Sequence, residues 1–201
     1  MNLIELSPGK TIDFENECYS SVDLEHFWAR WRFHILIQAL SNHYRSDTSE
    51  ITGLEIGGGN GLVRKQLEDH YGCRIDLCDI NPHALRQCYQ GKGDIYHYDI
   101  MEEHPSMLGK YDLVTLFDVL EHIEDSKPFL NAAMKHLKPG GLIAINVPAF
   151  NGLFSAYDHA LGHYRRYTIR TLKDETTGTS INERHTQYWG MSLLPLVAIR
   201  S

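Results

Sequence analysis

Short apolar runs alternate with amphipathic segments along the middle of the chain. The runs are continuous in their hydrophobicity instead of alternating, which is typical of strands in a parallel sheet that is covered on both faces. The pattern therefore predicts an α/β fold with a central, mainly parallel sheet and helices on both faces. The predicted strands are 51–56, 73–80, 93–100, 111–120 and 142–150, and the predicted helices between them are 60–70, 81–90 and 127–138.

The pattern changes on either side of this core. An amphipathic, aromatic-rich helix is predicted over 25–44, and the rhythm breaks after Phe150. A long segment without periodicity usually has a function. We therefore expect a single domain over 1–201, with an N-terminal helical segment (1–48), a ligand-binding core (49–150) and a lid loop (151–168). A short helix, a strand near 181–189 and a last helical turn are expected after the lid.

Composition limits the class of protein. The chain has 201 residues and a net charge of -7, which disfavours a nucleic-acid binder or an anionic-membrane binder. No run reaches the roughly 18 apolar residues of a membrane span, and the N-terminus lacks the order of a signal peptide. The cysteines Cys18, Cys73, Cys78 and Cys88 form no CxxC pair, so reduced thiols and a cytoplasmic location are expected.

A glycine-rich turn, "LEIGGGNGL" over 54–62, follows the first core strand. Its glycines are Gly57, Gly59 and Gly61, and Leu62 stands where a dinucleotide fingerprint would have its third glycine. Glu55 would lie badly beside a pyrophosphate but would suit a cationic ligand. A nicotinamide dehydrogenase is therefore disfavoured, although the sheet alone would allow it.

Two further acids end the next two predicted strands. Asp79 is placed to accept hydrogen bonds from both hydroxyls of a ribose, and Asp99 could accept one from an exocyclic amine. Alternatively, Asp99 is an ordinary solvent-facing residue, and Asp79 a helix cap, although Asn81 already suits that position. Three acids at three successive strand ends describe a ligand with a positive charge, a ribose and an adenine.

These motifs resemble those of the class I S-adenosylmethionine-dependent methyltransferases. The resemblance covers residues 25–168 and includes "LEIGGGNG", "LCDINP", "YHYDI", "FDVLEHIED" and "LKPGGLIAINVP". "EHFWARWR" and "DHALGHYRRYT" are similar to a branch that is often described as ubiquinone-type. The resemblance implies a Rossmann-like fold, S-adenosylmethionine as cofactor and methyl transfer to an O or N atom of a small molecule. It implies these cofactor-binding residues: Glu55, Gly57, Gly59, Asn60, Gly61, Asp79, Ile80, Asp99, Ile100, Phe117, Asp118 and His122.

Asp118, Glu121 and His122 follow the fourth core strand as D-x-x-E-H. Ubiquinone-biosynthesis O-methyltransferases and small-RNA 2′-O-methyltransferases hold a divalent cation with E-x-x-E-H at this place. Here the first acid is shorter by one methylene, and many relatives carry "LEH" without a metal. We expect no metal, so activity should survive EDTA.

The lid supplies the candidates for acceptor chemistry. His159 or His163 is expected to act as the base if the acceptor is a hydroxyl, and Tyr157, Arg165 and Arg166 are candidate substrate-binding residues together with Trp28. The alternatives are that the arginines pair with acids of the domain and that Trp28 only packs its helix. A cofactor-binding protein without transfer activity also stays open.

The end of the chain gives a last expectation about the sheet. Sheets of this family usually close with a sixth strand and a seventh, antiparallel strand. Residues 180–190 are the predicted sixth strand, whereas 191–201 contain Pro195, which is poorly suited to an inner strand. We expect the seventh strand to be absent from these 201 residues. The exposed edge would then be covered by residues 1–24 or by a homodimer contact.

Overall fold

A six-stranded parallel sheet forms the centre of the molecule, in the order β1-β4-β3-β2-β5-β6. The computed structural model describes residues 3–7, 23–41, 43–44 and 50–193. The strands are β1 (Leu3–Glu5), β2 (Thr52–Ile56), β3 (Arg74–Asp79), β4 (Ile95–His97), β5 (Tyr111–Phe117) and β6 (Leu137–Asn146). The α-helices are α2 (Phe27–Leu40), α3 (Leu62–Tyr71), α4 (Pro82–Arg86), α5 (Ser126–Lys135), α6 (Ala156–Ala160) and α7 (Ile169–Thr176).

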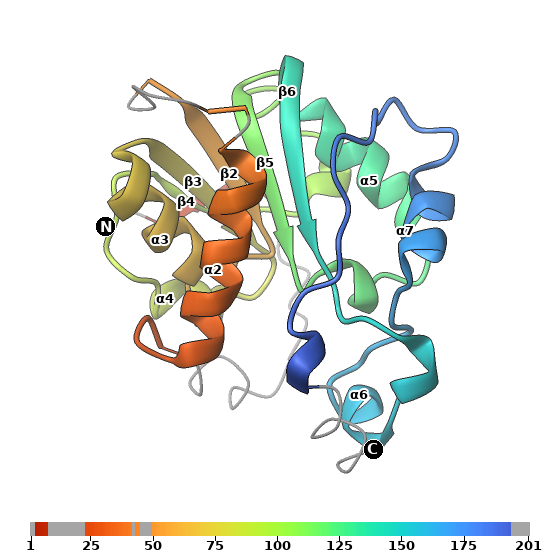
Figure 1. The fold of residues 1–201 in the computed structure, drawn as a ribbon. Helices are drawn as coiled ribbons and strands as arrows, with labels where there is room; N and C mark the ends of the chain where they lie inside the picture. Colours follow the sequence, from red (N-terminus) through yellow and green to blue (C-terminus); the bar gives the residue numbers. More distant parts are fainter. Residues whose placement is uncertain (1–2, 8–22, 42, 45–49, 194–201) are drawn as a thin grey trace.

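Helices cover both faces of this sheet (Figure 1). On one face, α2 and α3 bury Leu36, Leu40 and Leu67 against Ile75 of β3 and Leu113 of β5. On the other face, α5 packs against the side chains of β2 and β5 that point the opposite way. The predicted α/β architecture is confirmed.

The two edges of the sheet differ from the prediction. The strand predicted near 181–189 is wrong, because residues 181–190 have no regular secondary structure, and the sixth strand is β1 beside β4. Three residues are too few to carry a periodicity, which is why β1 was missed. No strand follows β6 within the residues described up to 193, and residues 194–201, where a seventh strand was not expected, lie outside them.

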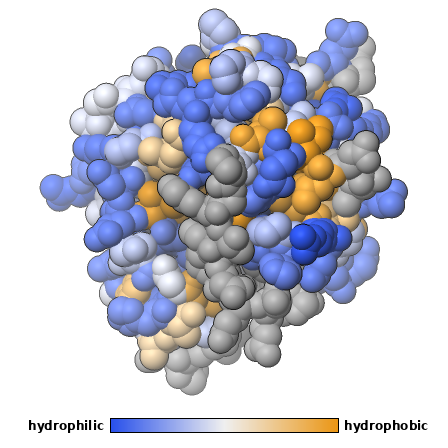
Figure 2. Space-filling view, turned by 180° about the vertical axis from the view of Figure 1, so that it is seen from behind, coloured by the Kyte–Doolittle hydropathy of each residue, from blue (hydrophilic) through white to orange (hydrophobic). Residues whose placement is uncertain are grey.

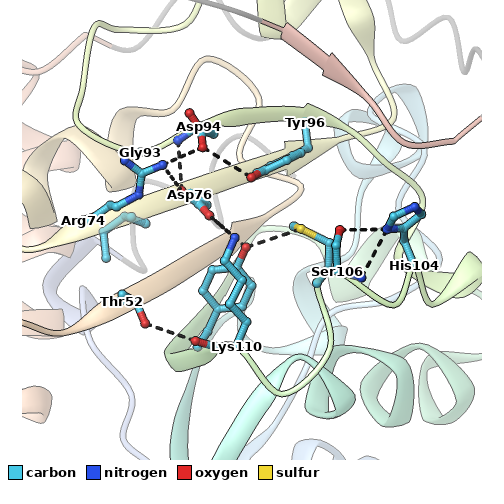
Figure 3. Close-up of polar contacts among 12 residues, drawn as sticks. Thr52, Arg74, Asp76, Gly93, Asp94, Tyr96, His104, Ser106 and Lys110 are labelled. Carbon is cyan, nitrogen blue, oxygen red and sulfur yellow. Dashed lines mark hydrogen bonds and ion pairs between the residues drawn. The ribbon is translucent and has the colours of Figure 1, made fainter.

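Asp76 of β3 lies at the centre of a polar cluster away from the carboxyl ends of the strands (Figure 3). Its buried carboxylate accepts hydrogen bonds from Lys110 Nζ at 2.9 Å, Tyr111 Oη at 2.9 Å and the Asp94 amide at 2.9 Å. Arg74 lies 3.3 Å from the same carboxylate and also pairs with Asp94. Burial and the Asp76 charge raise the pKa of Tyr111, so its hydroxyl remains a donor. Asp76 thus joins β3 to the starts of β4 and β5.

Glu68 and Arg64 of α3 fix the loop that leads into β4. The Glu68 carboxylate accepts the backbone amides of Ile75 at 3.0 Å, Lys92 at 2.7 Å and Gly93 at 2.8 Å. Arg64 is fully buried and donates to the carbonyls of Tyr89 and Gly93. These contacts fix the position of β4 along β3.

None of the described helices has both the length and the hydrophobicity that a bilayer crossing requires. Viewed from behind, several hydrophobic areas lie among hydrophilic side chains, the largest of them to the right of the centre (Figure 2). The described cysteines Cys73, Cys78 and Cys88 are buried and free, as the sequence predicted, and Cys18 lies outside the described residues.

Candidate functional site

The turn after β2 has a backbone that only glycine adopts easily. Gly57, Gly59 and Gly61 have φ angles of 66°, 54° and 74°. A Cβ atom on Gly57 would lie 2.7 Å from Val119, and one on Gly58 would lie 2.7 Å from the Glu55 carboxyl carbon. Side chains are therefore excluded for steric reasons, and the backbone is open to the carboxyl end of the sheet.

Glu55 is a buried acid directly before this turn. One carboxylate oxygen accepts the backbone amide of Arg64 at 2.7 Å, and the side chain lines a cavity beside the turn. Burial raises the pKa of Glu55 to about 7, against the opposing effect of that hydrogen bond. A cationic ligand in the cavity would favour the ionised carboxylate.

Asp79 ties the end of β3 to the glycine turn. One of its oxygens accepts the Gly59 amide at 2.8 Å and the other accepts the Asn81 amide at 2.7 Å. Burial raises the pKa of Asp79, and these hydrogen bonds oppose the shift. Each carboxylate oxygen keeps further acceptor capacity for a ligand hydroxyl. Asn81 caps α4 through bonds to the His83 and Ala84 amides, as predicted.

One connected cavity joins most of the residues that the sequence singled out, while three lie outside its lining. Asp99 is one of the three, and its side chain accepts the Met101 amide at 3.0 Å and caps a short 3₁₀-helix, η1 (Ile100–Glu102). Gly61 and Arg165 are the others. The predicted residues that line the cavity are Trp28, Glu55, Gly57, Gly59, Asn60, Asp79, Ile80, Ile100, Phe117, Asp118, His122, Tyr157, His159, His163 and Arg166.

Asp118 follows β5 with a φ angle of 57°, a conformation that is uncommon for a residue other than glycine. Its carboxylate forms an ion pair with Arg32 of α2 and accepts Asn146 Nδ2 of β6 at 2.8 Å. Arg32 also lies over the Phe117 ring, 5.3 Å from its centroid. Asp118 therefore connects α2 to the ends of β5 and β6, and its charge is already paired with the Arg32 guanidinium.

Glu121 and His122, in the loop after β5, form a cluster with His163. The potential ligand atoms of the three residues lie within 4.8 Å of one another. Glu121 is 1% exposed, and its Oε2 atom has no hydrogen-bond partner. Burial and then the Asp118 charge raise the pKa of Glu121 to about 9, while burial lowers the pKa of His122 to about 4. A buried carboxylate beside two imidazoles is a donor set that fits a divalent cation.

The segment predicted to be a lid, residues 151–168, is hydrogen-bonded to the loop after β5. The Tyr164 amide donates to the Glu121 carbonyl at 2.7 Å, and Tyr167 Oη donates to the Leu120 carbonyl at 3.1 Å. The His163 ring consequently lies against His122, with centroids 4.7 Å apart. His159 is exposed and packs against Phe154.

Asp158 is the buried anchor of the lid. It accepts the Ser155 amide at 2.9 Å, Arg166 Nε at 2.8 Å and His163 Nδ1 at 3.1 Å. Burial would raise the pKa of Asp158, but these bonds outweigh it and lower the pKa to about 2. An ionised carboxylate only accepts, so His163 Nδ1 carries a hydrogen and Nε2 is left as the basic nitrogen.

The candidate substrate-binding arginines pair with acids of the domain in this structure. Arg166 donates to Asp158, and Arg165 donates to Glu175 at 3.1 Å and to the Glu124 carbonyl. Trp28 packs against other aromatic residues while it lines the cavity. Their roles toward a substrate stay predictions.

Three residues of the site were missed in the sequence: Arg32, Asn146 and Trp189. Arg32 lies four residues after Trp28 on α2, so the helical period could have placed both on the cavity side. Asn146 lay inside the strand predicted over 142–150, whereas β6 ends at this residue and places it at the same edge of the sheet as Asp79. Trp189 carried no usable signal, because the segment around it was expected to be a strand.

The comparisons with known proteins concern the domain and its fold. Residues 54–143 match the family model of a methyltransferase domain. The ubiquinone biosynthesis O-methyltransferase of Rickettsia canadensis is 28% identical over 130 residues, which cover 63% of this chain and 53% of that protein. The enzyme of the same name from Sodalis glossinidius is 29% identical over 94 residues, covering 44% and 37%. The chain thus spans about half the length, or less, of these curated relatives.

Solved structures support the fold. Phosphoethanolamine N-methyltransferase 2 of Haemonchus contortus, in complex with S-adenosyl-L-methionine, has a TM-score of 0.59 at 18% identity, covering 73% of this chain and 36% of that one. A SAM dependent methyltransferase from Archaeoglobus fulgidus has a TM-score of 0.52 at 17% identity, covering 87% and 89%. The sheet, the glycine turn and the matched domain together support a class I S-adenosylmethionine-dependent methyltransferase.

Proposed function

We propose that this protein transfers a methyl group from S-adenosylmethionine to an O or N atom of a small-molecule acceptor. The observation that carries the proposal is that Glu55, the glycine turn and Asp79 line the same cavity. The Gly59 amide of the turn also donates a hydrogen bond to Asp79. The matched domain and the curated O-methyltransferase relatives support it.

The cofactor is assigned to the carboxyl ends of β2 and β3. Glu55 supplies negative charge for the cofactor's ammonium group, and Asp79 accepts from its ribose hydroxyls. Gly57 and Gly59 keep side chains away from it. Asp99 is assigned to the adenine, which requires its carboxylate to turn from the η1 cap toward the cavity.

Bound S-adenosylmethionine supplies a methyl group that is attached to a positively charged sulfur. When the methyl group is transferred, the sulfur becomes a neutral thioether and is the leaving group. The protein therefore has to align the acceptor and exclude water. For a hydroxyl acceptor, His163 Nε2 takes the proton, and Asp158 holds the ring through Nδ1. His159, which is exposed, is the second candidate base. An amine acceptor needs only its neutral form.

A divalent cation is a second role for the same cluster. Glu121, His122 and His163 would hold it, and the partnerless Oε2 of buried Glu121 supports this alternative. Asp118, the first acid of the sequence motif, would not take part while it is paired with Arg32. His163 cannot be both a metal ligand and the base through the same nitrogen, so the two roles are separable.

The setting of the reaction is also a proposal. The acidic balance of the chain supports a small-molecule acceptor over nucleic acid, and the reduced thiols support a cytoplasmic location. A homodimer remains a proposal. A cofactor-binding protein without transfer activity is the alternative function.

Calorimetry with S-adenosylmethionine, S-adenosylhomocysteine and NAD tests the cofactor. We expect the first two to bind and NAD to bind much more weakly. Binding of NAD in preference to both would overturn the proposal. A panel of phenols and amines, assayed for S-adenosylhomocysteine release, then separates an enzyme from a binding protein.

A further inference from the structure

The C-terminal part of the described chain lines the cavity. Residues 180–190, here named the strap, run beside β6 without forming a strand (Figure 1). Among the backbone hydrogen bonds of the described residues, none joins residues 180–189 to β6. Side chains fasten the strap instead, and several of them line the cavity that contains the glycine turn.

Aromatic contacts hold the C-terminal end of the strap, at Tyr188 and Trp189. Tyr188 stacks on Phe150, with ring centroids 4.8 Å apart, and its hydroxyl accepts the Ile169 amide at 3.0 Å. Trp189 packs against Trp28, with centroids 4.5 Å apart, and against Trp31 at 5.8 Å. The strap is therefore pinned by rings that can separate without breaking a backbone ladder.

Trp189 is also bonded to the end of the sheet. Its Nε1 donates to Asn146 Oδ1 at 2.9 Å, and Asn146 in turn donates to Asp118. Asp118 directly follows β5 and lines the cavity at the edge where the glycine turn lies. A flat ring with one N–H donor thus occupies a position between the aromatic face of α2 and the amide of Asn146.

We propose that Trp189 is an internal plug of the acceptor subsite, standing where a planar acceptor ring that carries an O–H or N–H donor would bind. The inference rests on the proposed function, because it deepens that function by giving the acceptor's chemical class. Such a ring would replace the indole against Trp28 and donate to Asn146 Oδ1, while the strap moves aside. Trp189 is a positioning residue here, and Asn146 is the acceptor's hydrogen-bond partner.

The price of opening is modest on this geometry. Opening breaks one neutral hydrogen bond and separates a few aromatic pairs, and each of these contributes little to stability. A ligand that restores both interactions recovers most of that cost. A ring without a donor would leave Asn146 Oδ1 without the bond from Trp189 and should bind less well.

Phenol and anisole are matched probes, because methylation of the phenol oxygen removes the donor and keeps the ring. All three tryptophans of the chain belong to this cluster, so the tryptophan fluorescence of the protein reports on the cluster that Trp189 leaves when the subsite opens. We expect phenol to shift the emission of the wild-type protein to the red, as Trp189 moves into water. Anisole should produce a smaller shift at the same concentration.

Calorimetry on variants completes the test. Trp189→Ala should bind phenol about tenfold more tightly than the wild type, because the subsite is then open before binding. Ser192→Ala is the control, since Ser192 is exposed just beyond the strap, lies outside the cavity lining and should leave the affinity unchanged. In the Trp189→Ala background, Asn146→Leu should remove the preference for phenol over anisole.

Equal phenol affinity in the wild type and Trp189→Ala, or equal affinity for phenol and anisole in Trp189→Ala, would overturn the plug. If Trp189→Ala fails to fold, Trp189→Phe keeps one aromatic ring, removes the N–H donor and should give a smaller gain in phenol affinity. No gain would count against the proposal. These readouts need no cofactor. A failure of S-adenosylmethionine binding would therefore overturn the proposed function without deciding the plug.

Discussion

Asp76 and Glu121 are both buried acids next to the same sheet, yet their surroundings are opposite. Asp76 accepts from an ammonium group, a phenol hydroxyl and a backbone amide, whereas Glu121 keeps an oxygen with no hydrogen-bond partner. Burial dominates at Glu121 and raises its pKa to about 9. A satisfied acid holds strands together, and an unsatisfied one costs stability and remains available for a ligand or a proton.

Removing the satisfied acid should give the largest loss of stability. Asp76→Ala leaves Lys110, Tyr111 Oη and the Asp94 amide without their common acceptor, and we expect a loss of about 3–5 kcal/mol in the free energy of unfolding. Urea denaturation measures it. Asp94→Ala is the control, because Asp94 is 48% exposed in its pair with Arg74 and should cost less than about 1 kcal/mol. Equal losses in the two variants would contradict the special role of Asp76.

Glu55 is a third buried acid, and its effect on the free energy of unfolding should depend on pH. Its pKa is raised to about 7, so between roughly pH 4.5 and 7 the native state keeps a proton that the unfolded chain has lost. Stability without cofactor should therefore fall as pH rises through this window, by up to about 3 kcal/mol. Glu55→Gln should flatten this fall in thermal unfolding followed at several pH values. A variant with the same slope as the wild type would remove Glu55 as the cause.

Asp79 tests whether the carboxyl end of the sheet binds the proposed cofactor. Asp79→Ala should weaken S-adenosylmethionine binding by roughly 2 kcal/mol, or ~30-fold, because a charge-assisted pair to the ribose is lost. Calorimetry measures the affinity. Asp69→Ala is a suitable control, since Asp69 is an exposed partner of Lys65 on α3 and lies outside the cavity lining. Unchanged affinity in Asp79→Ala would remove the ribose assignment.

The smallest effect on stability is expected at the unsatisfied acid itself. Glu121→Gln should change the free energy of unfolding at neutral pH by less than about 1 kcal/mol, or increase it, because burying the carboxyl group gains no hydrogen bond at Oε2. The same variant decides the metal question when zinc and manganese are titrated by calorimetry. Activity that survives EDTA supports the proton-transfer role of His163. Activity that EDTA abolishes, with metal binding lost in Glu121→Gln, would establish the cation.

The sequence predicted the features that depend on local pattern. Continuous apolar runs gave β2, β3, β5 and β6, and Asn81 with Pro82 gave the start of α4. Side-chain partners across the fold were beyond it. Nothing local indicates that Arg32 pairs with Asp118, 86 positions later, or that Trp189 bonds to Asn146. The contacts of residues 151–168 could not be predicted from the sequence either, because the pairing of Arg166 with buried Asp158 depends on the turn between them.

The short first strand has a consequence for folding and local opening. β1 pairs Leu3 with Ile95 and Glu5 with His97, so its contacts close a loop of more than ninety residues. Contacts of such high sequence separation form late and contribute to a slow folding rate. Three residues at an edge also make a small cooperative unit. Amide hydrogen exchange should therefore begin at β1 and the exposed side of β4 while β2, β3 and β5 remain protected, so that the molecule opens first at the edge farthest from its lid.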